Sequence, residues 1–148
     1  MYLRTHFLAG FLSARLFGFN AFYSIISGIL AVLIDLDHPI SYSIKHHKLK
    51  FKEVWNRCVR EETNARSFFH KAYGVVLSSL AIIIIYLLLS REIATIIFSA
   101  YYSHIVLDAV KFKRKRHWDF GRIFIVRTSI EDIILDSLLL IGSLLSFL

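Results

Sequence analysis

The chain has 148 residues, of which 56% are hydrophobic and 20% are charged, and it carries a formal net charge of +7 with a mean hydropathy of +0.57. Several of its segments approach the roughly 20 apolar residues that cross a bilayer, so the composition argues against a soluble domain and predicts one membrane-embedded domain over residues 1–148. The single cysteine, Cys58, excludes an internal disulfide and a zinc cluster built from thiolates.

The apolar pattern predicts an all-α integral membrane bundle of about four to five transmembrane or re-entrant helices. In chain order we expect helices over residues 5–17, 21–37, 67–90, 93–111 and from 129 to the C-terminus. Residues 18–20 are expected to form the first turn. Pro39 is expected to end the second helix, because proline disfavours helical geometry in the residue before it.

Positive charge is concentrated in residues 45–71 and 111–127, which is the pattern of cytoplasmic loops. We therefore expect a multi-pass protein of the inner or plasma membrane, whose third and fourth helices form a hairpin that turns at Arg91 and Glu92 on the far side. The ends of four helices then meet at the cytoplasmic face. The same topology accounts for the basic run at residues 111–116, so no nucleic-acid partner is expected.

Asp35, His104 and Asp108 are ionisable residues inside apolar segments, where a charge costs at least roughly 2.5 kcal/mol at the bilayer centre. His104 and Asp108 are four residues apart, so a helix directs both to the same side. Asp35 lies near the negative end of its helix, which is unfavourable for a carboxylate unless a cation compensates. Imidazole and carboxylate ligands suit Zn²⁺, Mn²⁺ or Fe²⁺. The pattern predicts a site for one or two divalent ions, with zinc or manganese preferred.

The predicted topology brings further ionisable residues to the same depth, namely His6, Asp37, His38, His70, Glu131 and Asp132. Four segments carry a family resemblance: His6, Asp35-Leu-Asp-His38, Arg66-Ser-Phe-Phe-His70 and Ser103-His-Ile-Val-Leu-Asp108. Together they resemble the membrane-bound metal-dependent hydrolases, also described as LexA-binding, inner-membrane-associated hydrolases, and their order is distantly similar to that of zinc-dependent phospholipase C. The resemblance covers about residues 1–110.

The resemblance implies a set of metal ligands, which are His6, Asp35, His70, His104 and Asp108. It also implies that Asp37 is a further ligand or a partner of one. Where that family has a histidine, this chain has Ala65. Glu131 or Asp132 is expected to replace that ligand or to act as general base.

The expected function is that of a metal-dependent hydrolase, which cleaves a phosphoester of a lipid or lipid-linked substrate through metal-activated water. Arg66 is expected to neutralise phosphate oxygens. The residues expected to take part in catalysis are Asp37, Arg66, Glu131 and Asp132. The expected partners are the membrane and a lipid phosphate that enters from it.

Two alternatives use the same residues without hydrolysis. A structural metal site predicts a closed shell of four ligands. A small cation or proton transporter predicts a polar path that continues through the bundle. The third and fourth helices offer few polar residues at depth, which counts against a transporter; these are Ser78, Ser79, Thr95 and Ser99.

Overall fold

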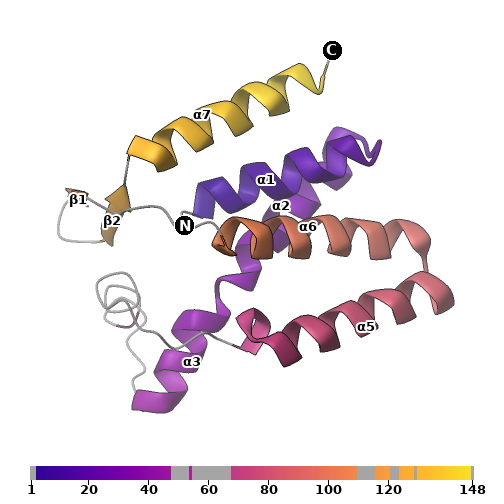
Figure 1. Cartoon of the computed structure of the whole chain (residues 1–148), viewed down its shortest axis with the longest axis horizontal. Helices are drawn as coiled ribbons and strands as arrows, with labels where there is room; N and C mark the ends of the chain where they lie inside the picture. Colours follow the sequence, from indigo (N-terminus) through magenta and orange to yellow (C-terminus); the bar gives the residue numbers. More distant parts are fainter. Residues whose placement is uncertain are drawn as a thin grey trace.

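The computed structural model describes residues 3–47, 54, 68–109, 116–120, 124–128 and 130–147. Its elements, in chain order, are α1 (Leu3–Leu16), α2 (Ala21–Ile34), α3 (Asp37–His46), η1 (Phe68–His70), α5 (Ala72–Leu88), α6 (Arg91–Ala109), β1 (Arg116–Phe120), β2 (Phe124–Thr128) and α7 (Ile130–Leu145). The predicted all-α bundle is confirmed, with a short strand hairpin as an addition (Figure 1).

Helix α1 lies at the centre of the bundle, where it contacts α2, α6 and α7. Helix α5 packs against α6, and the two form the hairpin expected for the third and fourth helices (Figure 1). The start of α1, the end of α2, the start of α5 and the end of α6 all lie toward one end of the bundle (Figure 1). Four segments that are distant in the sequence therefore meet there.

Local signals in the sequence explain where the helices start. Gly18 has a φ of 83°, in the left-handed region that glycine tolerates, and the Asn20 side chain caps α2 by accepting one of its first N–H groups. This confirms the predicted turn at residues 18–20. The Ser90 hydroxyl likewise accepts an N–H in the first turn of α6. Arg91 and Glu92 therefore begin α6 rather than form the turn before it.

The second predicted helix is divided in two. Helix α2 ends at Ile34, α3 begins at Asp37, and Asp35 and Leu36 form the turn between them. Pro39 lies in the first turn of α3, where an N–H has no partner within the helix and its loss costs little. The prediction that Pro39 ends the helix is wrong, because the break precedes it. This break leaves Asp35 at a junction between helices.

The third predicted helix is interrupted as well. η1 is a single 3₁₀ turn, and Lys71 then has extended backbone, with φ −92° and ψ 152°. A Cβ at Gly74 would lie 1.9 Å from the carbonyl oxygen of Phe68, so only glycine allows α5 to start against η1. The interruption places His70 on a turn of its own.

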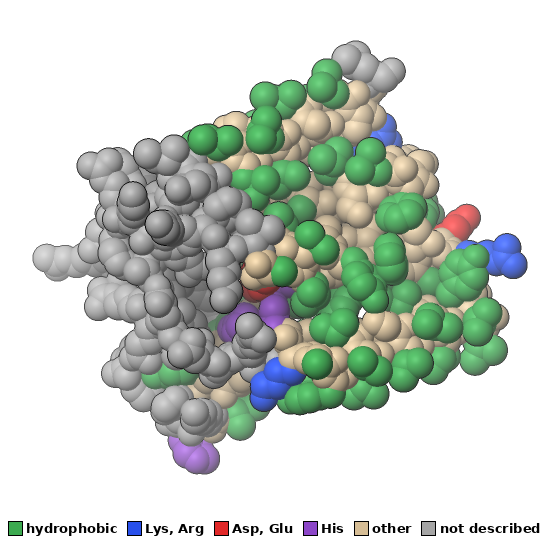
Figure 2. Space-filling view, in the orientation of Figure 1, with side chains coloured by type: hydrophobic (Ala, Val, Ile, Leu, Met, Phe, Trp, Pro, Cys, Tyr) green, Lys and Arg blue, Asp and Glu red, His purple; other side chains and the backbone are tan. Residues whose placement is uncertain are grey.

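Several polar side chains are fully buried in this bundle, and many large apolar ones are exposed. Among the described residues, the largest fully buried side chains are His6, His104, Val54, Thr5, Ser24, Ser27 and Ser99, and six of these seven are polar. Apolar side chains cover the outer faces of α5, α6 and α7 (Figure 2). A soluble protein shows the opposite distribution, whereas helices in lipid associate through small and polar residues.

Small residues bring α1 and α2 close together. A Cβ at Gly10 would lie 2.8 Å from the Cβ of Ala31 and 2.9 Å from the carbonyl oxygen of Ser27. The Ser27 hydroxyl donates to the carbonyl of Gly10 at 2.9 Å and lies 3.0 Å from the hydroxyl of Ser99 on α6. This contact fixes how α1, α2 and α6 are placed relative to one another.

By length and composition, one described stretch is long and apolar enough to cross a membrane, Ala21–Ile44, which includes α2 and most of α3. Helix α5 (Ala72–Leu88) and residues Ile133–Leu145 are apolar but shorter. The predicted bundle is therefore present, while four or five full spans stay a prediction.

Residues 116–128, predicted as part of a basic loop, contain a hairpin. Strands β1 and β2 pair antiparallel, with Arg116 opposite Thr128 and Phe120 opposite Phe124. Aromatic and β-branched residues favour strands, and both strands are rich in them. Within the basic stretch 45–71, residues 48–53 and 55–67 lie outside the described residues.

Candidate metal centre

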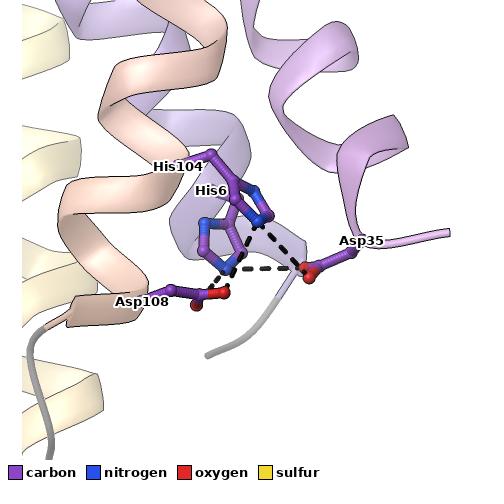
Figure 3. A group of neighbouring side chains, drawn as sticks. All are labelled: His6, Asp35, His104 and Asp108. Carbon is purple, nitrogen blue, oxygen red and sulfur yellow. Dashed lines mark ion pairs between the residues drawn. The ribbon is translucent and has the colours of Figure 1, made fainter. Parts of the chain in front are cut away.

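Four side chains from three parts of the fold point toward one another at one end of the bundle (Figure 3). His6 comes from the first turns of α1, Asp35 from the α2–α3 junction, and His104 and Asp108 from the last turns of α6. The Nε2 atom of His6 lies 3.5 Å from Oδ2 of Asp35 and 3.3 Å from Oδ1 of Asp108. The Nε2 atom of His104 lies 3.6 Å from Oδ1 of Asp35 and 3.5 Å from Oδ2 of Asp108.

His104 is held so that Nε2 faces the carboxylates. Its side chain is fully buried, and Nδ1 lies 2.8 Å from the carbonyl oxygen of Ala31. Because a carbonyl can only accept, Nδ1 donates to it, and Nε2 is the nitrogen that faces the carboxylates. A bond from the second ring nitrogen to a carbonyl is the usual way in which proteins orient a histidine ligand.

Of the four residues, His6 is the one that a purely structural role explains least. Its ring is fully buried and stacks on that of His104, with centroids 4.0 Å apart and planes inclined by 25°. Neither of its ring nitrogens has a hydrogen-bond partner among the described residues. A buried polar atom without a partner costs about 1–3 kcal/mol. Two carboxylates within 3.5 Å of its Nε2 make a cation the natural partner.

His70 approaches the group from η1. Its Nε2 lies 2.8 Å from Oδ2 of Asp108 and 2.9 Å from Nε2 of His104, and its Nδ1 lies 3.8 Å from Oδ2 of Asp37. Burial by itself lowers the pKa of His70, but hydrogen bonds to Asp108 and Asp37 and the charges of both carboxylates outweigh it, so the pKa is raised to about 9. Without a metal, a proton therefore occupies the space between His70 and Asp108.

A second group adjoins the first. Asp35, His38, His70 and Asp108 also present ligand atoms that lie within 4.8 Å of one another. The two groups share Asp35 and Asp108, while the histidines differ: His6 and His104 belong to one, His38 and His70 to the other. This is the arrangement in which two carboxylates can bridge two neighbouring cations.

The geometry fits a small divalent ion. Four ligand atoms held 2.0–2.1 Å from zinc at tetrahedral angles lie about 3.3 Å from one another. In the first group the four distances between imidazole nitrogen and carboxylate oxygen are 3.3 to 3.6 Å, with each aspartate meeting the two histidines through different oxygens, and one ligand atom from each residue lies within 4.8 Å of the other three. Imidazole with carboxylate suits zinc and also manganese or iron(II). The unpartnered nitrogens of His6 fit the same interpretation.

The structure brings together all five residues expected as ligands, which are His6, Asp35, His70, His104 and Asp108. Asp37 borders them and contacts η1 through the N–H of Phe69. Arg66 lies outside the described residues, as does Ala65. Glu131 and Asp132 occupy the first turn of α7, but their side chains are outside the described part of the chain.

His38 belongs to the second group, although the sequence interpretation assigned it no role in the site. The signal was present, since His38 follows Asp35 by three residues and would lie on the same side of a helix. Three residues of the α2–α3 segment, Asp35, Asp37 and His38, therefore line the centre.

Comparison with protein families gives one finding. A family model described as YdjM inner membrane protein matches residues 1–130, which include every described residue of the candidate metal centre. Searches of curated proteins and of solved structures returned no match. Together with the exposed apolar faces, the match supports an inner-membrane location.

Proposed function

The chain belongs to the YdjM inner membrane protein family, and we propose that it is a metal-dependent hydrolase that cleaves a phosphoester of a lipid or lipid-linked substrate. The observation that carries the proposal is the convergence of four histidines and two aspartates in two adjoining groups at one end of an apolar bundle. Zinc or manganese would suit these ligands best.

The roles of the residues follow from their contacts. His6 and His104 would hold one ion, His38 and His70 a second, and the carboxylates of Asp35 and Asp108 would bridge the two. Such ions polarise a phosphoryl oxygen and lower the pKa of bound water, which is the chemistry of many phosphoesterases. The carbonyl of Ala31 orients His104, and Asp37 borders His70.

The number of donors favours an enzyme over a structural metal site. A structural zinc site is closed by four ligands, whereas the two groups contain six different residues. Asp108 and His38 keep 22% and 32% of their side-chain surface exposed, so the centre is reachable from outside the bundle. A purely structural metal site does not need to be accessible to a substrate.

The surroundings favour an enzyme over a proton relay. Along α6, away from the centre, the nearest described polar contacts are hydroxyl groups. Ser99 donates to the carbonyl of Ile96 at 2.9 Å and lies beside Ser27, and neither hydroxyl titrates near neutral pH. A relay generally uses a chain of carboxylates and histidines, whereas α5 contains neither residue type and α6 has none between Glu92, at its far end, and His104.

A lipid substrate suits the exposed apolar faces next to the centre. Phe68 and Phe69 of η1 are 44% and 37% exposed, two residues and one residue before His70. Lys71 follows directly and would attract an anionic headgroup, worth about 1 kcal/mol per cation near a membrane surface. An acyl chain could lie against the phenylalanines while the phosphate reaches the metal centre. If the basic segments are cytoplasmic, the centre faces the cytoplasmic leaflet.

The first experiment measures metal content by elemental analysis of protein purified in detergent, and hydrolysis of phospholipids and lipid-linked phosphates. The wild type is compared with His104→Ala and with His47→Asn as a matched control. His47 is an exposed histidine with a φ of 51°, a conformation that asparagine tolerates.

We expect His104→Ala to lose metal and turnover, while His47→Asn keeps both. Turnover in the wild type that depends on added Zn²⁺ or Mn²⁺ would support the enzyme. Stoichiometric metal without turnover on any phosphoester would favour the structural site, and unchanged metal in His104→Ala would remove His104 from the centre.

A further inference from the structure

One residue of the candidate centre, His70, lies on a short element that has little stability of its own. His70 ends η1, a 3₁₀ turn of three residues, and short 3₁₀ turns have poor hydrogen-bond geometry of their own. Within η1 and the start of α5, the turn is closed by the N–H of Lys71, which donates to the carbonyl of Phe68 at 3.2 Å. His104 and Asp108, by contrast, project from a helix of 19 residues. Something outside η1 must therefore fix the position of His70.

Both polar groups of the Phe69 backbone are bonded to other elements. Its N–H donates to Oδ2 of Asp37 in α3 at 3.3 Å. Its carbonyl, which belongs to the peptide bond joining it to His70, accepts from the hydroxyl of Tyr101 in α6 at 2.9 Å. The peptide groups on both sides of Phe69 are thus held, directly before the histidine.

Tyr101 is well placed for this contact. Its side chain is only 4% exposed, and it precedes His104 by three residues, so α6 directs both toward the same side. The ring also belongs to the apolar core formed with Ile82 and Ala94. A single helix face therefore carries His104 and, through Tyr101, the anchor of η1.

We propose that Tyr101 is a positioning residue of the metal centre: by donating to the Phe69 carbonyl, it places His70 so that Nε2 meets His104 and Asp108. The proposal rests on the metal centre of the proposed function, although the contact itself does not require a metal. Tyr101 is not a ligand, and its hydroxyl acts on the centre through the backbone of η1.

The test compares two neighbouring tyrosines of α6 that each lose one hydroxyl. Tyr101→Phe removes the bond to η1. Tyr102→Phe removes a bond of similar kind, 2.7 Å to the hydroxyl of Ser79 in α5, and has no described bond to η1. Both variants keep an aromatic ring, so packing is preserved in each.

We expect Tyr101→Phe to bind Zn²⁺ about 10- to 100-fold more weakly, which is the usual effect of losing a group that orients a ligand. Tyr102→Phe should bind as the wild type does, although the two variants lose similar thermal stability. The absorption bands of the Co²⁺-loaded protein, which report ligand geometry, should change only in Tyr101→Phe. Equal Zn²⁺ affinity in the two variants would overturn the proposal.

A second measurement shows whether the effect runs through His70. In a His70→Ala background, adding Tyr101→Phe should have no further effect on Zn²⁺ binding, because residues that act on one another are not additive. A full additional loss would mean that Tyr101 acts elsewhere.

These experiments distinguish failure of the proposed function from failure of the positioning role of Tyr101. If the wild type binds Zn²⁺ without any turnover, the hydrolase proposal fails and positioning by Tyr101 is still decided by affinity. If the wild type binds no metal, we measure the rate at which diethyl pyrocarbonate modifies His70, followed by mass spectrometry. Faster modification in Tyr101→Phe than in Tyr102→Phe would support positioning, and equal rates would overturn it.

Discussion

Helix α1 takes part in two buried polar contacts, which differ in whether the side chain of α1 is hydrogen-bonded to other protein groups. Thr5 and His6 are neighbours, and both are fully buried. The Thr5 hydroxyl donates to a carboxylate oxygen of Asp136 on α7, and Arg4 bonds to the other oxygen. His6 faces the metal centre on another side of α1, and neither of its nitrogens is hydrogen-bonded within the described residues.

The difference separates two uses of buried polar groups. At the α1–α7 contact the protein satisfies its own polar groups, as also happens where Arg15 donates to the backbone of Ser146. At the candidate metal centre the donors converge, and both ring nitrogens of His6 are buried without a hydrogen-bond partner among the described residues, which is the pattern expected where a ligand completes the group.

The largest effect on metal binding is expected from Asp108→Asn. Asp108 lies within 3.5 Å of three histidines, His6, His70 and His104, and belongs to both groups. Removing its charge should lower Zn²⁺ affinity more than about 100-fold, beyond the effect of losing a group that only orients a ligand. Metal content by elemental analysis and a chelator competition measure it. Unaltered metal content would mean that the carboxylates are not ligands.

Two substitutions at neighbouring positions of α1 should separate metal binding from stability. His6→Leu replaces an unpartnered buried imidazole by an apolar side chain of similar volume, so the metal-free protein should keep or gain stability while metal binding falls. Thr5→Val should do the reverse: it loses about 1 kcal/mol of stability and keeps the metal. Thermal unfolding in detergent with a chelator, together with metal analysis, separates the two. A strong loss of metal-free stability in His6→Leu would identify His6 as a structural residue.

Asp136→Ala tests the α1–α7 contact alone. It leaves the hydroxyl of Thr5 without its acceptor and removes the partner of Arg4, which should destabilise the protein by about 1–3 kcal/mol. Metal affinity should stay within about twofold of wild type. Unfolding and zinc titration are measured on the same preparation, with Ser137→Ala, an exposed neighbour on α7, as the control. Loss of metal in Asp136→Ala would show that the two contacts of α1 are coupled.

The smallest effect concerns pH. In the metal-free protein the pKa of His70 is raised from 6.5 to about 9, so protonated His70 stabilises the fold fully below pH 6.5 and this contribution is lost as the pH rises through about 9. The chelated wild type should therefore lose thermal stability between pH 6.5 and 9.5 relative to His70→Gln. Parallel curves for the two proteins would contradict the contact with Asp108. Zn²⁺ should reverse the trend, because binding requires the neutral ring.

Part of this structure could be predicted from the residues. The limits of α1, α6 and α7 follow from apolar runs and from polar residues at their ends, and the spacing of His104 and Asp108 already placed them on one side of a helix. Asp35 stood out as a charge in an apolar segment. The breaks around it and before α5 were not predicted, since Pro39 was taken as a stop signal and Gly74 carried no evident role.

By itself, the sequence determined the class of protein, the helices and the chemistry available to the site. Apolar segments without water must form helices to satisfy their backbone, and the types of ionisable residue within them restrict the cations that they can bind. Only the tertiary structure decided which side of α1 carries His6, that His38 joins the centre, and that Tyr101 reaches the backbone before His70. These outcomes depend on how closely the helices approach, and that approach is set by contacts such as Gly10 against Ala31, between residues too far apart in the sequence for any local pattern to relate them.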